Sequence, residues 1–243
     1  MVPEREVDPA VLYEQERHAF VALLRGRSAQ ELATTVSATP AWTVHDVLSH
    51  VVGITADLNA QRFGSGDSDA WTAGQIAARR VASIDELAAE WDREGPQFES
   101  GLRLFGYQFG AHYLGDLLQH VGDVHVTLGL VPARDDLALA VALDFYLAAF
   151  EQTLAARGVG AVGVAVSDGD GDGDEHWHLG EGTVRATVTA PRWDLFRALG
   201  GRRTLGEIGA LRWSGDRDVI APLVSQYPAP ASPLHEPTVP DRP

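Results

Sequence analysis

One stretch of this sequence carries side chains whose types and spacing suit metal chemistry. Residues 110–129 read GAHYLGDLLQHVGDVHVTLG. In a helix, steps of about 100° per residue place four polar residues within about 80° of one another, opposite an apolar face: His112, Asp116, His120 and Asp123. A stripe of carboxylates and imidazoles on an apolar helix costs free energy unless something compensates it. A bound divalent metal ion would do so.

Two residues of this stripe could share one ion. Asp116 and His120 are spaced i, i+4, so a single helix can present both to a metal. The third ligand must come from another helix, and His50 is the best candidate because it lies in a second apolar segment, TPAWTVHDVLSHVVG at residues 39–53. Three nitrogen and oxygen ligands leave a coordination position open, as in catalytic zinc sites. Spacing alone leaves open the alternative that His120 is a hydrogen-bonded interior histidine and Asp116 a solvated charge.

The neighbouring polar residues have other expected roles. Asp123 either orients a metal ligand through a hydrogen bond or lies exposed on the surface. We expect His112 to lie in the first turn, away from the ion. His45 and His125 are expected to be structural.

Two further patterns do not carry function. Glycines 158, 160 and 163 spell GxGxxG, but they follow a predicted helix and open a valine-rich strand, the reverse of a dinucleotide-binding turn. The run DGDGDGDE at residues 168–175 has leucine at the twelfth position of a calcium loop, which excludes an EF-hand. We expect a flexible hairpin turn there instead.

The N-terminal half is predicted to be all helical. Apolar residues at helical spacing predict one helix over residues 9–27, one after the N-cap residue Thr43, one after Ser83 and one that carries the polar stripe. We expect Pro96 to interrupt the third of these. Four main helices predict a four-helix bundle, a fold in which facing helices often build metal sites.

After residue 132 the pattern changes. A further apolar helix is followed by alternating, valine-rich segments, which predict a small α+β domain with an antiparallel sheet. The expected fold class is therefore α followed by α+β. The expected domains are a metal-binding helical bundle (1–132), the α+β domain (133–227) and a disordered tail (228–243) that holds six prolines in sixteen residues.

Composition excludes several kinds of chemistry. The 243-residue chain has a net charge of −15, which argues against a nucleic-acid partner. It contains no cysteine and no lysine, which excludes disulfides, thiolate nucleophiles, Schiff bases and the phosphate-loop lysine. We identified no apolar run of the roughly 20 residues that a membrane span needs, and the acidic N-terminus is not a secretory signal. The expected location is the cytoplasm.

Three motifs resemble those of a known family. They are Trp-Thr-Val-x-Asp-Val-x-x-His at residues 42–50, acid-x3-His-x2-Asp at Asp116, His120 and Asp123, and WDLFRALGGRR with LRWSGD at residues 193–203 and 211–216. Together they resemble the mycothiol-dependent maleylpyruvate isomerase family. This family is a branch of the DinB-like helical bundles, with a C-terminal module similar to sterol-carrier proteins. The resemblance spans nearly the whole chain up to the proline-rich tail.

The resemblance implies roles for particular residues. His50, Asp116 and His120 occupy the zinc-ligand positions, and the zinc would hold a water or the thiol of mycothiol. The family normally has glutamate where Asp116 stands, and aspartate is one methylene shorter. The family also has a functional arginine in its second domain, for which Arg202 is the best match and Arg203 the rival.

The expected function follows from these residues and from the resemblance. We expect an enzyme that depends on Zn²⁺ or another divalent metal and uses a low-molecular-weight thiol, mycothiol, in transfer to, or isomerisation of, a small electrophilic carboxylate such as maleylpyruvate. A cysteine-free protein must import the sulfur for such chemistry, and an arginine would bind the carboxylate. The alternatives are a hydrolase with zinc-bound water and a non-catalytic binding or stress-response module. The expected partners are small molecules, without nucleic acid or membrane, for a monomer or homodimer.

Overall fold

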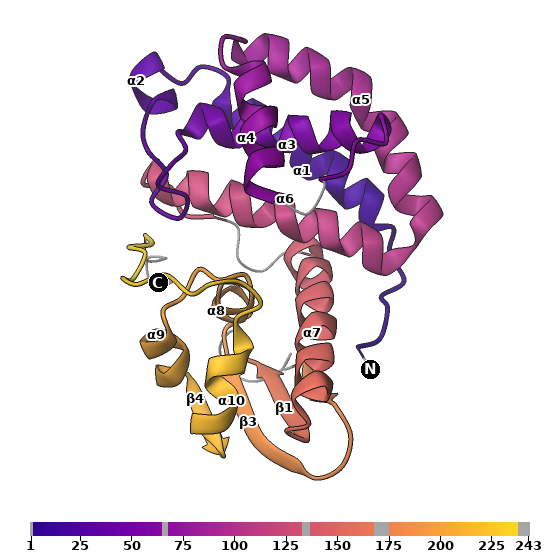
Figure 1. Cartoon of the computed structure of the whole chain (residues 1–243), viewed down its shortest axis with the longest axis vertical. Coiled ribbons are helices and arrows are strands. Elements are labelled where there is room, and N and C mark those ends of the chain that lie inside the picture. The colour runs from indigo at the N-terminus through magenta and orange to yellow at the C-terminus, as the bar shows by residue number, and fades with distance from the viewer. Residues whose placement is uncertain (1, 65–67, 133–136, 168–174, 238–243) are drawn as a thin grey trace, which may run out of the picture. The chain divides into compact units, whose positions relative to one another are not determined.

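A computed structural model describes residues 2–64, 68–132, 137–167 and 175–237 of the chain (Figure 1). Its contacts divide it into two compact units. One holds the N-terminal helices and the end of α6 from His120 on, and the other holds the segment before Asp8, residues 111–119 of α6, and the elements that follow. The expected domain limits at residues 132 and 227 remain predictions, and residues 133–136 of the expected boundary lie outside the described part.

The N-terminal half is helical, as predicted. Four long helices and two short ones form it: α1 (Pro9–Leu24), α2 (Ala29–Leu32), α3 (Val44–Asn59), α4 (Ser68–Arg79), α5 (Ile84–Phe105) and α6 (Tyr107–Thr127).

Side-chain caps determine where two of the long helices begin. Thr43 accepts a hydrogen bond from the backbone N–H of Asp46, whose carboxylate accepts one from the N–H of Thr43, so a capping box starts α3. Ser83 and Glu86 start α5 in the same way. Each box satisfies backbone donors that a helix start leaves without a partner.

Helix α5 differs from the expectation at Pro96. The proline lies inside the helix, which runs without a break from Ile84 to Phe105. Pro96 is exposed, so water can bond the backbone carbonyl that loses its partner. The buried face meanwhile continues through Trp91 and Phe98, and its packing holds the helix together across the proline.

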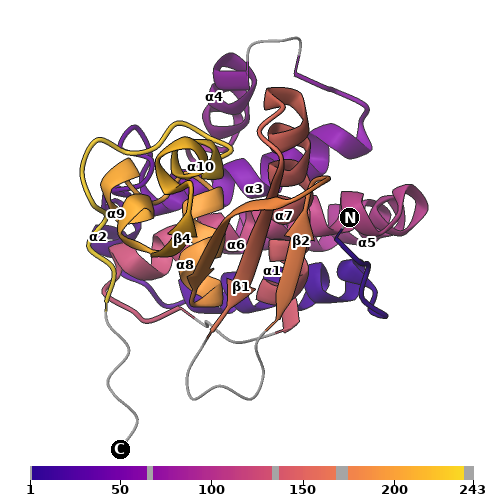
Figure 2. The same cartoon turned by 90° about the horizontal axis from the view of Figure 1, so that it is seen from below.

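The second half is α+β, as predicted, but its sheet is mixed rather than antiparallel. Strand β1 pairs antiparallel with β2 and parallel with β3, in the order β2-β1-β3-β4 (Figure 2). The reason is topological. Strand β3 runs opposite to β2, as in an antiparallel sheet, but it pairs with the free edge of β1 rather than with β2. Its neighbour is therefore β1, which runs in the same direction. The elements are α7 (Leu137–Arg157), β1 (Ala161–Val166), β2 (His176–Leu179), β3 (Val184–Ala190), α8 (Arg192–Leu199), α9 (Leu205–Ala210), β4 (Arg212–Gly215) and α10 (Arg217–Val224).

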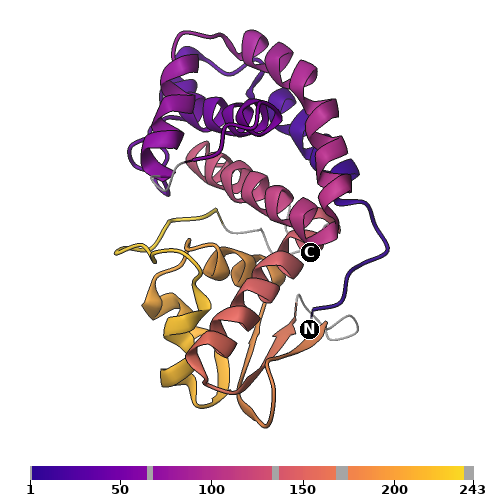
Figure 3. The same ribbon diagram turned by 45° about the vertical axis from the view of Figure 1, so that its right-hand side comes forward.

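Helix α7 is long and apolar, although we expected no apolar run of the length that a membrane span needs. It is 21 residues long with a mean hydropathy of 1.4 in its most apolar window, so length and composition alone would permit a membrane span. However, 61% of that window is buried, and α7 packs against α8 and β2 (Figure 3). Its buried Asp144 pairs with Arg5 at 2.8 Å. These are properties of a core helix.

Two expected irregular segments lie partly outside the described part of the chain. Only Glu175 of the predicted turn at 168–175 is described, and it pairs with Arg5. Residues 228–237 of the predicted tail are described and contain no helix or strand. Disorder of the tail remains a prediction.

Candidate metal centre

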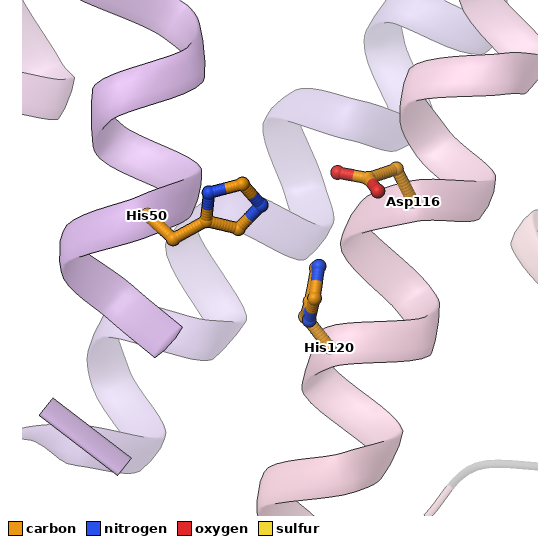
Figure 4. A group of neighbouring side chains, drawn as sticks. All are labelled: His50, Asp116 and His120. Carbon is orange, nitrogen blue, oxygen red and sulfur yellow. The ribbon is translucent and has the colours of Figure 1, made fainter. Parts of the chain in front are cut away.

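Three of the predicted site residues converge between α3 and α6. Each of His50, Asp116 and His120 offers one potential ligand atom, and these three atoms lie within 4.8 Å of one another. Figure 4 shows the three side chains pointing toward a common point. His50 and His120 belong to the same compact unit, and Asp116 lies one turn before His120 on α6. Both imidazoles are buried, at 6% exposure each, while Asp116 is partly exposed.

Aromatic rings fix the orientation of the two imidazoles. The rings of His50 and His120 meet edge to face, with centroids 5.0 Å apart at 80°. Trp42, from the segment before α3, lies 4.9 Å from the His50 ring and 5.8 Å from the His120 ring. Trp42 therefore forms a wall beside both rings and restricts their rotation.

The backbone at both helix starts positions these side chains. The capping box at Thr43 fixes the first turn of α3, and the buried Val47, Leu48 and Val51 hold the helix around His50. Between α5 and α6, Gly106 has φ +90°, a conformation that side chains with a Cβ rarely adopt. This glycine lets α6 begin immediately after α5 in a new direction.

The donor set fits a divalent transition metal. Two imidazole nitrogens and one carboxylate oxygen are ligands that Zn²⁺ accepts, and bonds of about 2.0–2.1 Å in a tetrahedron would bring the donors to about 3.4 Å from one another. The observed separations of up to 4.8 Å require small side-chain movements to reach this. Asp116 has the shortest reach, because it is an aspartate.

A polar chain that the sequence analysis missed continues behind His50. The Nδ1 atom of His50 lies 2.9 Å from Oε1 of Gln75, and Nε2 of Gln75 donates to Oδ2 of Asp57 at 3.0 Å. Gln75 comes from α4 and is 3% exposed. No motif marks it, and helical periodicity would have placed its neighbour Ile76 inside instead.

The first half of the chain also matches a known domain. The sequence model of the mycothiol maleylpyruvate isomerase N-terminal domain matches residues 13–107. These residues belong to that domain family. A search of curated proteins and one of solved structures found no match.

The matched segment contains only part of the site. His50, Trp42 and Gln75 lie within it, whereas Asp116 and His120 lie on α6 beyond its end. The family match therefore covers one of the three candidate ligands, His50, and the residues around it. The other two candidate ligands rest on the geometry of the site.

The other residues of the polar stripe separate into different environments. Asp123 is 2% exposed, which excludes the surface position that the sequence left open. His112 stacks on Phe145 at 4.4 Å. His45 bonds to the carbonyl of Ala82 through Nε2, and His125 bonds to that of Val121 through Nδ1, as expected of structural histidines.

The two candidate arginines also differ. Nη2 of Arg203 donates to Asp194 at 2.9 Å in an ion pair. Arg202 donates from Nη1 to the carbonyl of Gly200 at 2.7 Å. Its positive charge also lowers the pKa values of Tyr146 and Tyr227.

The negative charge of Asp116 raises the pKa values of the same two phenols. Burial raises the pKa of Tyr227, Asp116 raises that pKa further and Arg202 lowers it. The pKa of the buried Tyr146 is also raised, chiefly by burial. Both phenols are therefore protonated at neutral pH and can donate hydrogen bonds.

Proposed function

We propose that this protein is a metal-dependent enzyme that uses a low-molecular-weight thiol on a small electrophilic carboxylate. The metal is Zn²⁺ or another divalent ion, the thiol is mycothiol, and the reaction is S-transfer or an isomerisation such as that of maleylpyruvate. The convergence of His50, Asp116 and His120 within 4.8 Å carries this proposal. The match of residues 13–107 to the mycothiol-associated domain supports the choice of thiol.

The number of protein ligands suits catalysis rather than structure. Structural zinc is held by four protein ligands, whereas three leave a position for a water or a substrate. A zinc ion in this position would stabilise a thiolate near neutral pH. The chain has no cysteine, so a thiol must come from outside.

The residues around Asp116 suit an anionic substrate. The guanidinium of Arg202 can bind a carboxylate through two parallel hydrogen bonds. Arg202 and Asp116 both act electrostatically on Tyr227, so the three groups share one neighbourhood within the same compact unit. The protonated Tyr227 can donate a further hydrogen bond to an anion. We assign Arg202 the role of carboxylate binder and Asp123 that of a positioning residue for a ligand.

Two alternatives predict different behaviour of the open coordination position. A hydrolase would use it for water and would not respond to thiol, and a binding module without turnover need not hold a metal at all. Metal content of protein purified without chelator separates the binding module from both enzymes. The response of the bound metal to a thiol separates the two enzymes from one another.

Cobalt substitution tests the thiol directly. Co²⁺ reports its ligands in its absorption spectrum, so we expect mycothiol to produce a thiolate-to-cobalt charge-transfer band. The S-methylated thiol, which has no ionisable sulfur, is the matched control and should leave the spectrum unchanged. A spectrum that does not respond to mycothiol would contradict the thiol-dependent function and favour hydrolysis.

A further inference from the structure

Helix α4 contributes a single buried residue, and that residue is polar. The side chain of Gln75 is 3% exposed, and all other residues of α4 are at least partly exposed. A buried amide costs free energy unless its hydrogen bonds are made. Gln75 makes them at both ends, with His50 on one side and Asp57 on the other.

The chemistry of Asp57 fixes which way the amide points. A carboxylate only accepts hydrogen bonds, so the NH₂ group of Gln75 must face Asp57, as it does at 3.0 Å. Asp57 also pairs with Arg62 at 2.8 Å. The carbonyl oxygen of Gln75 consequently faces His50, and only a protonated Nδ1 can donate to it.

The position of α4 is constrained on both sides of Gln75. A Cβ atom at Gly53 would lie 2.6 Å from Cβ of Gln75, so a glycine is needed for α4 to approach α3 this closely. Arg79 donates from Nη1 to the backbone carbonyl of Gln75 and pairs with Glu90 of α5. Gln75 is therefore held at His50 by packing as well as by hydrogen bonds.

We propose that Gln75, oriented by Asp57, is a positioning residue that holds His50 in the Nδ1–H tautomer. In this tautomer Nε2 is the unprotonated nitrogen that can bind a metal ion, and Figure 4 shows the ring nitrogen remote from α3 directed toward Asp116 and His120. A histidine that binds a metal through one nitrogen is ordinarily oriented through the other. The inference rests on the proposed metal site, but the tautomer of His50 can be measured separately in metal-free protein.

Nitrogen NMR of the His50 side chain in metal-free protein tests the tautomer. We expect Nδ1 to carry the proton in the wild type. Finding the proton on Nε2 would overturn the proposal without any variant. Because no metal is involved, this result is independent of whether the proposed function holds.

Variants then test the link to metal affinity, measured by competition with a chromophoric chelator. Gln75→Ala should shift the proton of His50 toward Nε2 and weaken Zn²⁺ binding by about 10- to 100-fold. The double variant Gln75→Glu/Asp57→Asn exchanges the carboxylate and the amide while keeping an acceptor beside Nδ1, so it should restore both the tautomer and the affinity.

A matched control separates this role from a general effect on α4. The hydroxyl of Thr72 donates to the carbonyl of Ser68 in the same helix, its one bond among the described residues, so Thr72→Ala perturbs α4 without touching His50. It should leave the tautomer and the affinity at wild-type values. Equal losses in Thr72→Ala and Gln75→Ala, or a Gln75→Ala variant with wild-type tautomer and affinity, would overturn the proposal.

Discussion

Nη1 of Arg197 lies 2.8 Å from Oε1 of Gln119, although 78 residues separate the two in the sequence. Arg197 is fully buried, and its guanidinium also lies over the ring of Trp193. The amide of Gln119 in turn donates to the carbonyl of Phe196 at 2.9 Å. These bonds fasten α6 to α8 within one compact unit, one residue before the candidate ligand His120.

Removing the Gln119 side chain should therefore be costly. Gln119→Ala takes an acceptor from a buried guanidinium, and we expect the free energy of unfolding to fall by about 2 kcal/mol in urea denaturation. The exposed Gln97 of α5 provides the control, and Gln97→Ala should change stability by less than about 0.5 kcal/mol. Equal effects of the two substitutions would show that the contact with Arg197 is not stabilising.

Stability should depend on pH through His112. Burial lowers the pKa of this imidazole, and the nearby Asp116 opposes the shift only in part. A lowered pKa means that the neutral form stabilises the fold above about pH 6.5, and that this contribution is lost as the pH falls toward the folded-state pKa. His112→Phe keeps the stack on Phe145 and removes the titration. Denaturation between about pH 7.5 and 5 should show a steeper loss in the wild type, and parallel curves would contradict the assignment.

The buried pair of Arg17 and Glu99 gives a prediction of opposite sign. The two side chains are 3% and 6% exposed, and burial raises the pKa of Glu99 although Arg17 opposes it. Arg17→Met leaves a buried carboxylate without its cation and should cost about 3 kcal/mol near neutral pH. A raised pKa contributes stability below the unfolded-state value that is lost as the pH rises, so the cost should shrink at about pH 5.

The double variant Arg17→Met/Glu99→Met controls for lost packing. It removes both charges, so it should recover most of the stability lost in Arg17→Met. Its stability relative to the wild type should also change less with pH. A cost of Arg17→Met that is the same at both pH values would refute the buried charge as its cause.

The sequence predicts the helical elements because their signals are local. Thr43 and Ser83 mark two helix starts by capping alone, and the i, i+4 spacing places Asp116 and His120 on one face. The link between α3 and α6 needed more than spacing. His50 was chosen because its segment, residues 39–53, is apolar enough to be buried, and the resemblance implied the same residue.

What the sequence missed depends on contacts between distant elements. Pro96 breaks a helix by local rules, but the packing of Trp91 and Phe98 on either side overrides them. The parallel pairing of β1 with β3 depends on which edge of β1 is open, and no residue of β3 signals it. The sequence predicts Gln75 to be an ordinary surface residue, because its burial depends on the close approach of α4 to Gly53 of α3.

Turnover should distinguish the two candidate arginines. Arg202→Ala should lower kcat/KM for a carboxylate substrate such as maleylpyruvate with mycothiol by about 100-fold, because it removes a preorganised charge. Arg203 is paired with Asp194, so Arg203→Ala should lower stability while leaving kcat/KM close to the wild-type value. Steady-state kinetics on folded variants decides between them. A larger loss in Arg203→Ala would reverse the assignment.

The metal content of one variant tests the central claim most directly. Wild-type protein purified without chelator should carry about one divalent ion per chain by elemental analysis. His120→Ala should carry almost none, because two ligands cannot hold the ion, whereas the control His125→Ala, on the same helix but bonded to the carbonyl of Val121, should keep it. Full occupancy in His120→Ala would contradict a metal centre built from His50, Asp116 and His120.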